Sequence, residues 1–379
     1  LRLLNEQLEV DRAEDLPESI EGDTSLLLLD RAMVLQQLGR TELSSRDLEV
    51  CDKKVELLDL SRGTADELGK YLFSDDTGPY KAPAYEKLMI NTANLINYLV
   101  RGDLSGARVE ARRLAIMQRY LKENEDPSDA LLAPGSYLSG FVFEKSGKAQ
   151  EALRYYDEAL QSGDLPSLHP AIRRLAEQAT FRTPRLTQIL DANKSPLTPP
   201  SETADTNPPS AATAPQAAAQ SPAEVLVIVQ YGRVPAKEAE RVPIGLALTY
   251  AAGAISPQDA AQANALAAQG LVTWVNYPVL GKARGQYGRP GFALDGQWQS
   301  LDGVVSVDEA ARSAWERNRG AVVAAAITRM ISRVVAGEAV RRASGEGLTG
   351  LLLSLGTQAT MTAVDTPDTR SWATLPARI

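Results

Sequence analysis

The sequence predicts an N-terminal all-α domain of TPR-like helical repeats and a C-terminal α+β domain with a small sheet and one long helix. Small and aromatic residues recur at helical spacing before residue 192, a Pro- and Ala-rich stretch covers 193–223, and β-branched runs precede a long helical pattern in 224–379. The predicted organisation is therefore a helical-repeat domain (1–192), a disordered linker (193–223) and an α+β domain (224–379).

The most specific repeat unit lies between residues 140 and 159. Gly140 and Phe143 precede a turn glycine, and Ala152 and Tyr156 follow it at a spacing of four residues. Such spacing is typical of tetratricopeptide repeats, where small residues let two antiparallel helices pack closely. The same spacing of small residues and large apolar residues around a turn glycine occurs in 95–114 and, more weakly, in 32–51. Because the turn glycines at 39, 102 and 147 are unequally spaced, an ordinary α-helical bundle stays open as the alternative.

The stretch 193–223 has the composition of a linker. Its 31 residues hold seven Pro and eight Ala and no aromatic residue. Such a segment buries too little apolar surface to offset the entropy lost on ordering. We therefore expect the two predicted domains to move independently or to serve separate partners.

Extended segments and helices are both predicted after the linker. The run 224–231 is rich in β-branched residues and has strand length, 242–248 is a second, irregular extended segment, and 271–277 alternates as a strand does. Ser256 followed by Pro suits the N-cap and first position of a helix. Apolar residues in 304–342 fall close to helical spacing and predict one long helix, whose mixed arginines and glutamates favour a solvated face over a nucleic-acid or membrane stripe.

Charge and hydropathy exclude some classes of partner. Residues 1–192 carry 24 Lys and Arg against 33 Asp and Glu, a net charge of −9, whereas 224–379 carry 15 against 13, a net charge of +2. Because phosphate binding needs clustered cations, we expect no nucleic-acid partner. No run of about 18 apolar residues occurs, so no membrane-spanning helix is expected.

The sequence contains few residues that could carry catalysis. Cys51 is the only cysteine and His169 the only histidine, and no nucleophile motif such as G-x-S-x-G is present. We interpret Cys51 as a buried helix residue and His169 as a surface loop residue. We therefore expect a non-enzymatic protein with no cofactor and no metal site, although an enzyme that uses carboxylate, Tyr or Ser side chains stays open.

A partner-binding groove is predicted on the first helices of the repeats, because these helices usually line the concave face of a repeat array. Aromatic and aliphatic residues rimmed by polar ones suit a peptide or protein groove. The alternative is that residues such as Ile96 and Val100 only pack against a neighbouring segment. The predicted groove residues are Met33, Gln36, Ile96, Val100, Tyr137, Phe141, Glu144 and Lys145.

The glycine-rich basic segment 281–291 is a possible anion contact through Lys282, Arg284 and Arg289. It lacks the G-K-[ST] ending and the following helix of a phosphate-binding loop. We therefore interpret it as a surface loop that is able to touch an anionic partner such as a lipid headgroup or a glycan.

Several motifs resemble a known family. The segment 78–88 (GPYKAPAYEKL) leads into 97–103 (NYLVRGD) and 107–113 (ARVEARR), and the chain closes with 368–376 (DTRSWATLP). These segments resemble a group of poorly characterised bacterial outer-membrane lipoproteins with N-terminal TPR-like repeats. The resemblance covers most of both predicted domains. It implies export to the periplasm, a lipidated cysteine upstream of Leu1, outer-membrane attachment, and an accessory role without an established reaction.

The closing motif also has a structural interpretation. Arg370 can pair with the carboxylate of Asp365 or Asp368, and Trp372 can be buried beside that pair. We prefer a structural clasp that closes the C-terminal domain over a binding site.

Together these patterns predict a non-enzymatic cell-envelope scaffold or assembly lipoprotein that binds envelope proteins through residues 1–192. The alternative is an accessory regulator of cell-wall or glycan enzymes that acts through 224–379, with the basic loop as its only sequence motif.

Overall fold

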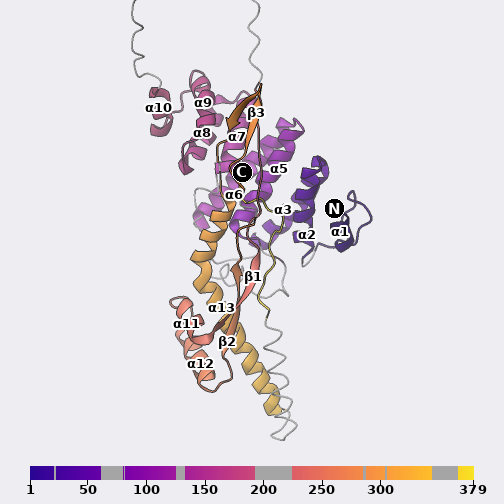
Figure 1. Cartoon of the computed structure of the whole chain (residues 1–379), viewed down its shortest axis with the longest axis vertical. Coiled ribbons are helices and arrows are strands. Elements are labelled where there is room, and N and C mark those ends of the chain that lie inside the picture. The colour runs from indigo at the N-terminus through magenta and orange to yellow at the C-terminus, as the bar shows by residue number, and fades with distance from the viewer. Residues whose placement is uncertain are drawn as a thin grey trace, which may run out of the picture.

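A computed structural model describes residues 1–20, 23–60, 80, 82–124, 133–192, 224–284, 287–303, 305–343 and 366–379. Figure 1 shows an elongated molecule in which the N-terminal helices gather in one half and the long helix α13 (Val307–Ala343) runs into the other. The predicted linker 193–223 lies outside the described residues.

The N-terminal half is helical, as the sequence predicts. Consecutive helices pack as the hairpins α2–α3, α5–α6 and α7–α8, and the glycines at their turns, Gly39, Gly102 and Gly147, have positive φ angles of 73°, 71° and 70°. The TPR-like character of these hairpins stays a prediction. The helices are α1 (Arg2–Gln7), α2 (Thr24–Gln37), α3 (Thr41–Leu60), α5 (Ala84–Val100), α6 (Leu104–Asn124), α7 (Ala133–Lys145), α8 (Ala149–Ala159), α9 (His169–Ala176) and α10 (Pro184–Asp191), with the 3-10 helices η2 (Leu160–Ser162) and η3 (Pro166–Leu168).

Small residues in the hairpins have a clear steric role. A Cβ atom on Gly140 of α7 would lie 2.3 Å from the ring of Tyr156 of α8, and one on Gly106 of α6 would lie 2.3 Å from the ring of Tyr98 of α5. The aromatic ring of one helix therefore rests on the bare backbone of its partner. This contact explains the glycine and aromatic spacing that the sequence shows.

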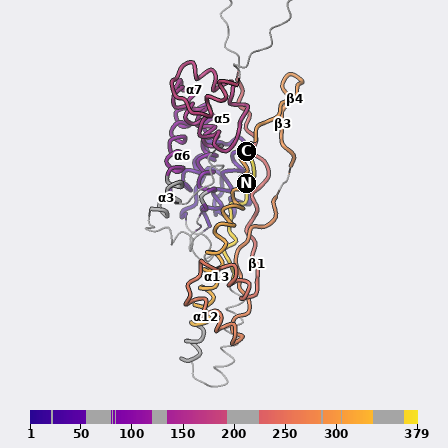
Figure 2. The backbone as a smooth tube through the Cα atoms, turned by 90° about the vertical axis from the view of Figure 1, so that its left-hand side faces the viewer, coloured from indigo at the N-terminus to yellow at the C-terminus, as the bar shows by residue number. Residues whose placement is uncertain are grey.

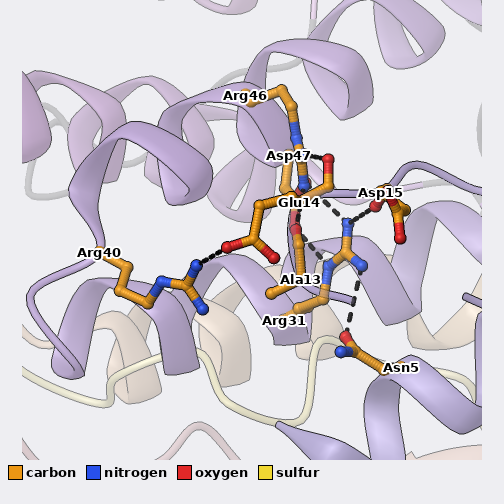
Figure 3. Close-up of polar contacts among 8 residues, drawn as sticks. All are labelled: Asn5, Ala13, Glu14, Asp15, Arg31, Arg40, Arg46 and Asp47. Carbon is orange, nitrogen blue, oxygen red and sulfur yellow. Dashed lines mark hydrogen bonds and ion pairs between the residues drawn. The ribbon is translucent and has the colours of Figure 1, made fainter. Parts of the chain in front are cut away.

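The first residues of the chain are held to the hairpin α2–α3 by arginines (Figure 3). Arg31 of α2 is fully buried and donates two hydrogen bonds, of 2.7 and 3.0 Å, to the Asp47 carboxylate on α3. The same guanidinium donates to the Asp15 carbonyl oxygen at 3.1 Å and to Asn5 Oδ1 at 3.4 Å. Because its donors are distributed over several partners, Arg31 is compensated despite its burial.

The C-terminal half contains the predicted small sheet and the long helix. Strands β1 (Lys237–Pro243) and β2 (Trp274–Leu280) pair antiparallel, with Val242 opposite Val275. The helices α11 (Ile244–Tyr250) and α12 (Pro257–Ala268) pack with this pair against α13. The predicted helix start at Ser256 is confirmed, since its Oγ accepts a hydrogen bond from the Asp259 N–H at 3.0 Å.

Two predicted extended segments are wrong in part. Residues 244–248 belong to α11, because Pro243 ends the strand and Ala247 packs into the core that includes α13. Residues 224–230 pair with no other described segment as a strand, although Tyr231 forms an isolated bridge with Arg378. The hairpin of β3 (Gly291–Leu294) and β4 (Gln297–Ser300) is absent from the sequence prediction, even though its turn residues Asp295 and Gly296 are a favoured two-residue turn pair.

The end of the chain packs against the N-terminal helices. One hydrophobic core contains Leu29 and Leu88 from α2 and α5, Val307 from the start of α13, and Trp372 and Leu375 from the closing motif. Arg378 forms bridges with both Tyr231 and Ser306, so the last residues lie between two other C-terminal segments. Among the residues described, no helix is long and apolar enough to span a membrane.

Candidate partner-binding groove

The candidate site is a cavity of about 630 Å³ beside α7. Its walls are α7, the region of η3, the segment 224–231 and the hairpin β3–β4, which stands out from the helical body in Figure 2. Such a volume lies within the range of about 300–1,000 Å³ that is typical of ligand pockets. The lining is aromatic and aliphatic with a few charged groups.

Three predicted groove residues line this cavity. Tyr137, Phe141 and Glu144 are spaced by four and three residues, so they share one face of α7. The Tyr137 ring meets the Tyr156 ring edge-on, with centroids 6.3 Å apart, and its hydroxyl lies 3.0 Å from Ser167 Oγ. Burial raises the pKa of the Tyr137 hydroxyl above its ordinary value, so this group stays neutral.

A charge cluster includes two acids of the cavity lining, Glu144 and Glu224. The carboxylate of Glu224 pairs with Lys145, and Arg174 of α9 contacts both Glu144 and Glu224. The Tyr156 hydroxyl donates to Glu144 at 2.6 Å. The hydrogen bond from Lys145 lowers the pKa of Glu224, so this carboxylate is ionised and the two acids are balanced by two cations. Lys145, the fourth predicted groove residue of α7, therefore helps to hold residue 224 against the helix.

The segment after the linker occupies part of the groove. Leu226 and Ile228 pack against the core of α7, α8 and α9, and their spacing of two residues is that of an extended chain. Residues 225–229 all line the cavity. Among the described residues, this stretch makes no backbone hydrogen bond. Side chains and the ion pairs of Glu224 thus hold an extended segment of the chain on α7.

The other predicted groove residues lie elsewhere. Met33 and Ile96 are buried in the hydrophobic cores, and Gln36 Nε2 donates to the Ala93 carbonyl oxygen at 3.0 Å and to Asn97 Oδ1 at 2.9 Å. Val100 is exposed at the end of α5. None of these four positions lines the cavity. Met33 lies in the core that α2 shares with α5, and Ile96 lies in the core that α5 shares with α7 and α8. Helical periodicity identifies a buried face but does not say which neighbour covers it.

The three cations of the predicted anion contact are also separated. Arg284 donates to the carbonyl oxygens of Val234 at 2.6 Å and Ala373 at 3.2 Å, so it joins two segments of the backbone. Burial lowers the pKa of Arg284 from its ordinary value. Arg289 lines the cavity, and Lys282 is exposed. Within the described residues these side chains form no common anion site.

The closing motif forms the predicted ion pair but with additional partners. Arg370 donates to both carboxylate oxygens of Asp368, at 2.8 and 2.9 Å, and to Asp23 at 2.6 Å. Trp372 is almost fully buried. Thr374 donates twice to Asp30 of α2, at 2.7 and 2.8 Å. Contrary to the expectation of a clasp within the C-terminal domain, these contacts join the motif to the N-terminal helices. Asp365 lies outside the described residues.

A buried polar cluster lies under the closing motif. The Tyr80 hydroxyl donates a hydrogen bond to Glu86 of α5 at 2.5 Å, and the backbone N–H of Trp372 donates to the same side chain at 3.5 Å. Burial raises the pKa of Glu86 to about 7, and it lowers the pKa of the buried Lys237. The sequence offers no signal for this cluster, because its members come from distant parts of the chain.

The single cysteine and the single histidine each contact one oxygen atom of another residue. Cys51 is fully buried in α3, with its Sγ 3.2 Å from the Ser25 carbonyl oxygen, and burial raises the pKa of its thiol. The His169 Nε2 atom lies 2.7 Å from the Asp164 carboxylate, at the start of α9. In the part of the chain that the structure describes, no three His, Cys, Asp or Glu side chains are grouped as metal ligands.

Comparisons with known proteins return no matching family model, no matching curated protein and no matching solved structure.

Proposed function

We propose that this protein is a non-enzymatic cell-envelope scaffold that binds protein partners at the cavity beside α7. One observation carries the proposal: α7 holds an extended segment of the chain itself, anchored by aliphatic side chains and by the ion pairs of Glu224. A surface that accepts one extended polypeptide has the chemistry to accept another. The remaining cavity of about 630 Å³ leaves room for part of a partner.

The cellular location in this proposal rests on the resemblance of the sequence motifs to outer-membrane lipoproteins. The proposed location is the periplasm, with attachment to the outer membrane through a lipid anchor upstream of Leu1. The same resemblance supports the proposal that the helical hairpins are of the TPR-like type. Separation of inner-membrane, outer-membrane and soluble fractions tests this part. Recovery of the full-length protein with the cytosol would refute the envelope assignment and would leave the binding surface to be judged separately.

Photo-crosslinking in the native cells tests the binding surface. A benzophenone amino acid at Tyr137 places the reactive group in the cavity, and the same amino acid at the exposed Val109 of α6 is the matched control. We expect crosslinks to envelope proteins from position 137 that are absent from position 109. Identical crosslinked proteins from both positions, or none from position 137, would refute the groove.

A substitution provides a second measurement on the same surface. Phe141 is half-buried in the cavity wall, and Phe141→Ala removes an aromatic contact surface from it. We expect the variant to lose most of the crosslinked partner, since truncation of an anchor residue typically costs about 2 kcal/mol or more of binding free energy. Val109→Ala is expected to leave crosslinking unchanged.

A further inference from the structure

The segment 225–229 is extended and, within the part of the chain that the structure describes, has no strand partner. Its sequence, Val-Leu-Val-Ile-Val, has the strongest β-forming composition in the chain, yet among the described residues its backbone makes no hydrogen bond. The ladder starts only at Tyr231, which exchanges two backbone hydrogen bonds of 3.1 Å with Arg378. A row of backbone N–H and C=O groups without ladder partners is a template for another strand.

The cavity follows the backbone of this segment. Side chains of an extended chain alternate between two faces, so a cavity that touched one face alone would be lined by every second residue. Instead, all five residues of 225–229 line it, over a length of about 17 Å for an extended chain. The cavity therefore runs along one backbone edge of the segment.

The opposite walls provide apolar contacts for the side chains of an added strand. Tyr137 and Phe141 lie on the α7 side, and Phe292 of β3 lies on the hairpin side. The acids Glu144 and Glu224 are already paired with Lys145 and Arg174. The remaining charged lining residues, Arg289 and Asp302, have opposite signs, so the lining favours a neutral occupant.

We propose that the cavity accepts a neutral, extended segment of a partner protein, which adds to residues 225–229 as a β-strand. The inference rests on the proposed function, because it specifies how the same groove binds protein. Main-chain hydrogen bonds supply affinity in such strand addition, and alternate side chains enter the flanking pockets. A lipid chain or another apolar small molecule would leave the N–H and C=O groups of 225–229 without partners, which disfavours both.

A proline substitution separates strand addition from side-chain contact. In Val227→Pro the full-length chain loses one N–H, and no backbone hydrogen bond to another described residue is lost with it. Val227→Thr keeps the N–H and the β-branched shape and is the matched control. We expect both variants to melt within about 2 °C of the parent protein, because neither removes a ladder contact.

The binding probe is a synthetic peptide of about eight alternating Val and Thr residues, compared with the same peptide N-methylated at every second position. We expect the unmodified peptide to bind the full-length chain saturably in fluorescence anisotropy and to slow amide hydrogen exchange at 225–229. N-methylation and Val227→Pro are each expected to weaken binding by about tenfold or more, whereas Val227→Thr keeps it.

Each other outcome overturns the strand-addition mode. Equal affinity for the N-methylated peptide would show that side chains alone are recognised. Slowed exchange at a distant helix, or no binding of the unmodified peptide, would place recognition elsewhere. If position 137 still crosslinks envelope proteins in those cases, the proposed function stands without strand addition. If the peptide binds as expected but position 137 crosslinks no protein in cells, the scaffold function fails instead.

Discussion

At the scale of single residues, the structure is marked by ionisable side chains that are buried with partners. Arg31 and Asp47 have fully buried side chains, and Glu86, Lys237 and Asp368 are also buried. Each is expensive to remove from water, and each is stabilised by several hydrogen bonds or opposite charges. These residues therefore tolerate conservative replacement poorly, although none of them lies in the groove.

Removal of one member of the Arg31–Asp47 pair is expected to destabilise the protein by about 3–5 kcal/mol, because the other charge is left buried without compensation. Asp47→Asn is the variant to measure, by urea unfolding of the full-length chain. Glu6→Gln is the matched control, since Glu6 belongs to an exposed pair with Arg2 and such pairs contribute about 0–1 kcal/mol. Equal effects of the two substitutions would contradict the structural role of the buried pair.

Glu86 predicts a pH dependence of stability. Its pKa is raised to about 7 in the folded protein from an ordinary value of 4.5, so the folded state holds a proton that the unfolded state releases. The protonated Glu86 carboxyl therefore contributes about 3 kcal/mol to the free energy of unfolding. This contribution is complete below pH 4.5 and is lost as the pH rises through 7. Its neighbours include Tyr80, Tyr85, Lys237 and Asp30.

The measurement is the difference in unfolding free energy between the parent protein and Glu86→Gln from pH 4.5 to pH 8. Because the amide does not titrate, we expect the parent to lose stability relative to the variant as the pH rises. Glu238→Gln, at an exposed position of β1, serves as the control and is expected to show no such trend. A pH-independent difference for Glu86→Gln would show that the carboxyl is charged throughout.

At the scale of elements, the helical hairpins depend on glycine where two helices cross closely. Gly140→Ala places a Cβ atom 2.3 Å from the Tyr156 ring, and we expect it to destabilise the protein by about 1–3 kcal/mol through overpacking. Gly245→Ala in α11 has open space around its Cβ position and is expected to be neutral or to stabilise by up to about 1 kcal/mol. Thermal melts of both variants decide this, and a neutral Gly140→Ala would show that α7 and α8 are not closely packed there.

At the scale of the whole molecule, the closing motif connects the two halves. Trp372→Ala is expected to cost about 3–5 kcal/mol in the full-length chain, because the indole lies in a core that contains Leu29 and Leu88. We further expect faster amide exchange in α2 and α5. Trp298→Ala, at an exposed position of β4, is the control and is expected to change stability little. Faster exchange confined to α11 and α12 would indicate a clasp within the C-terminal half.

Local physical chemistry in the sequence by itself determined much of this protein. The helical N-terminal half, the turn glycines, the N-cap at Ser256, the long helix and the pairing of Arg370 with Asp368 follow from periodicity, backbone freedom and neighbouring charges. Each depends on residues within a few positions of one another. The aromatic face of α7 was also predictable, since Tyr137, Phe141 and Glu144 recur at helical spacing.

Only the tertiary structure decided how these pieces meet. Among the described residues it leaves the strongly β-forming run 225–229 without a backbone partner, and it places Met33 and Ile96 in hydrophobic cores, where neither lines the cavity. It also brings Trp372 beside helices of the N-terminal half, as its contact with Glu86 over a separation of 286 residues shows. The physical reason is that a periodic pattern identifies a face to be covered, whereas the identity of the cover depends on contacts between distant segments. The groove itself is such a contact, formed where a helix, a hairpin and the segment after the linker enclose one cavity.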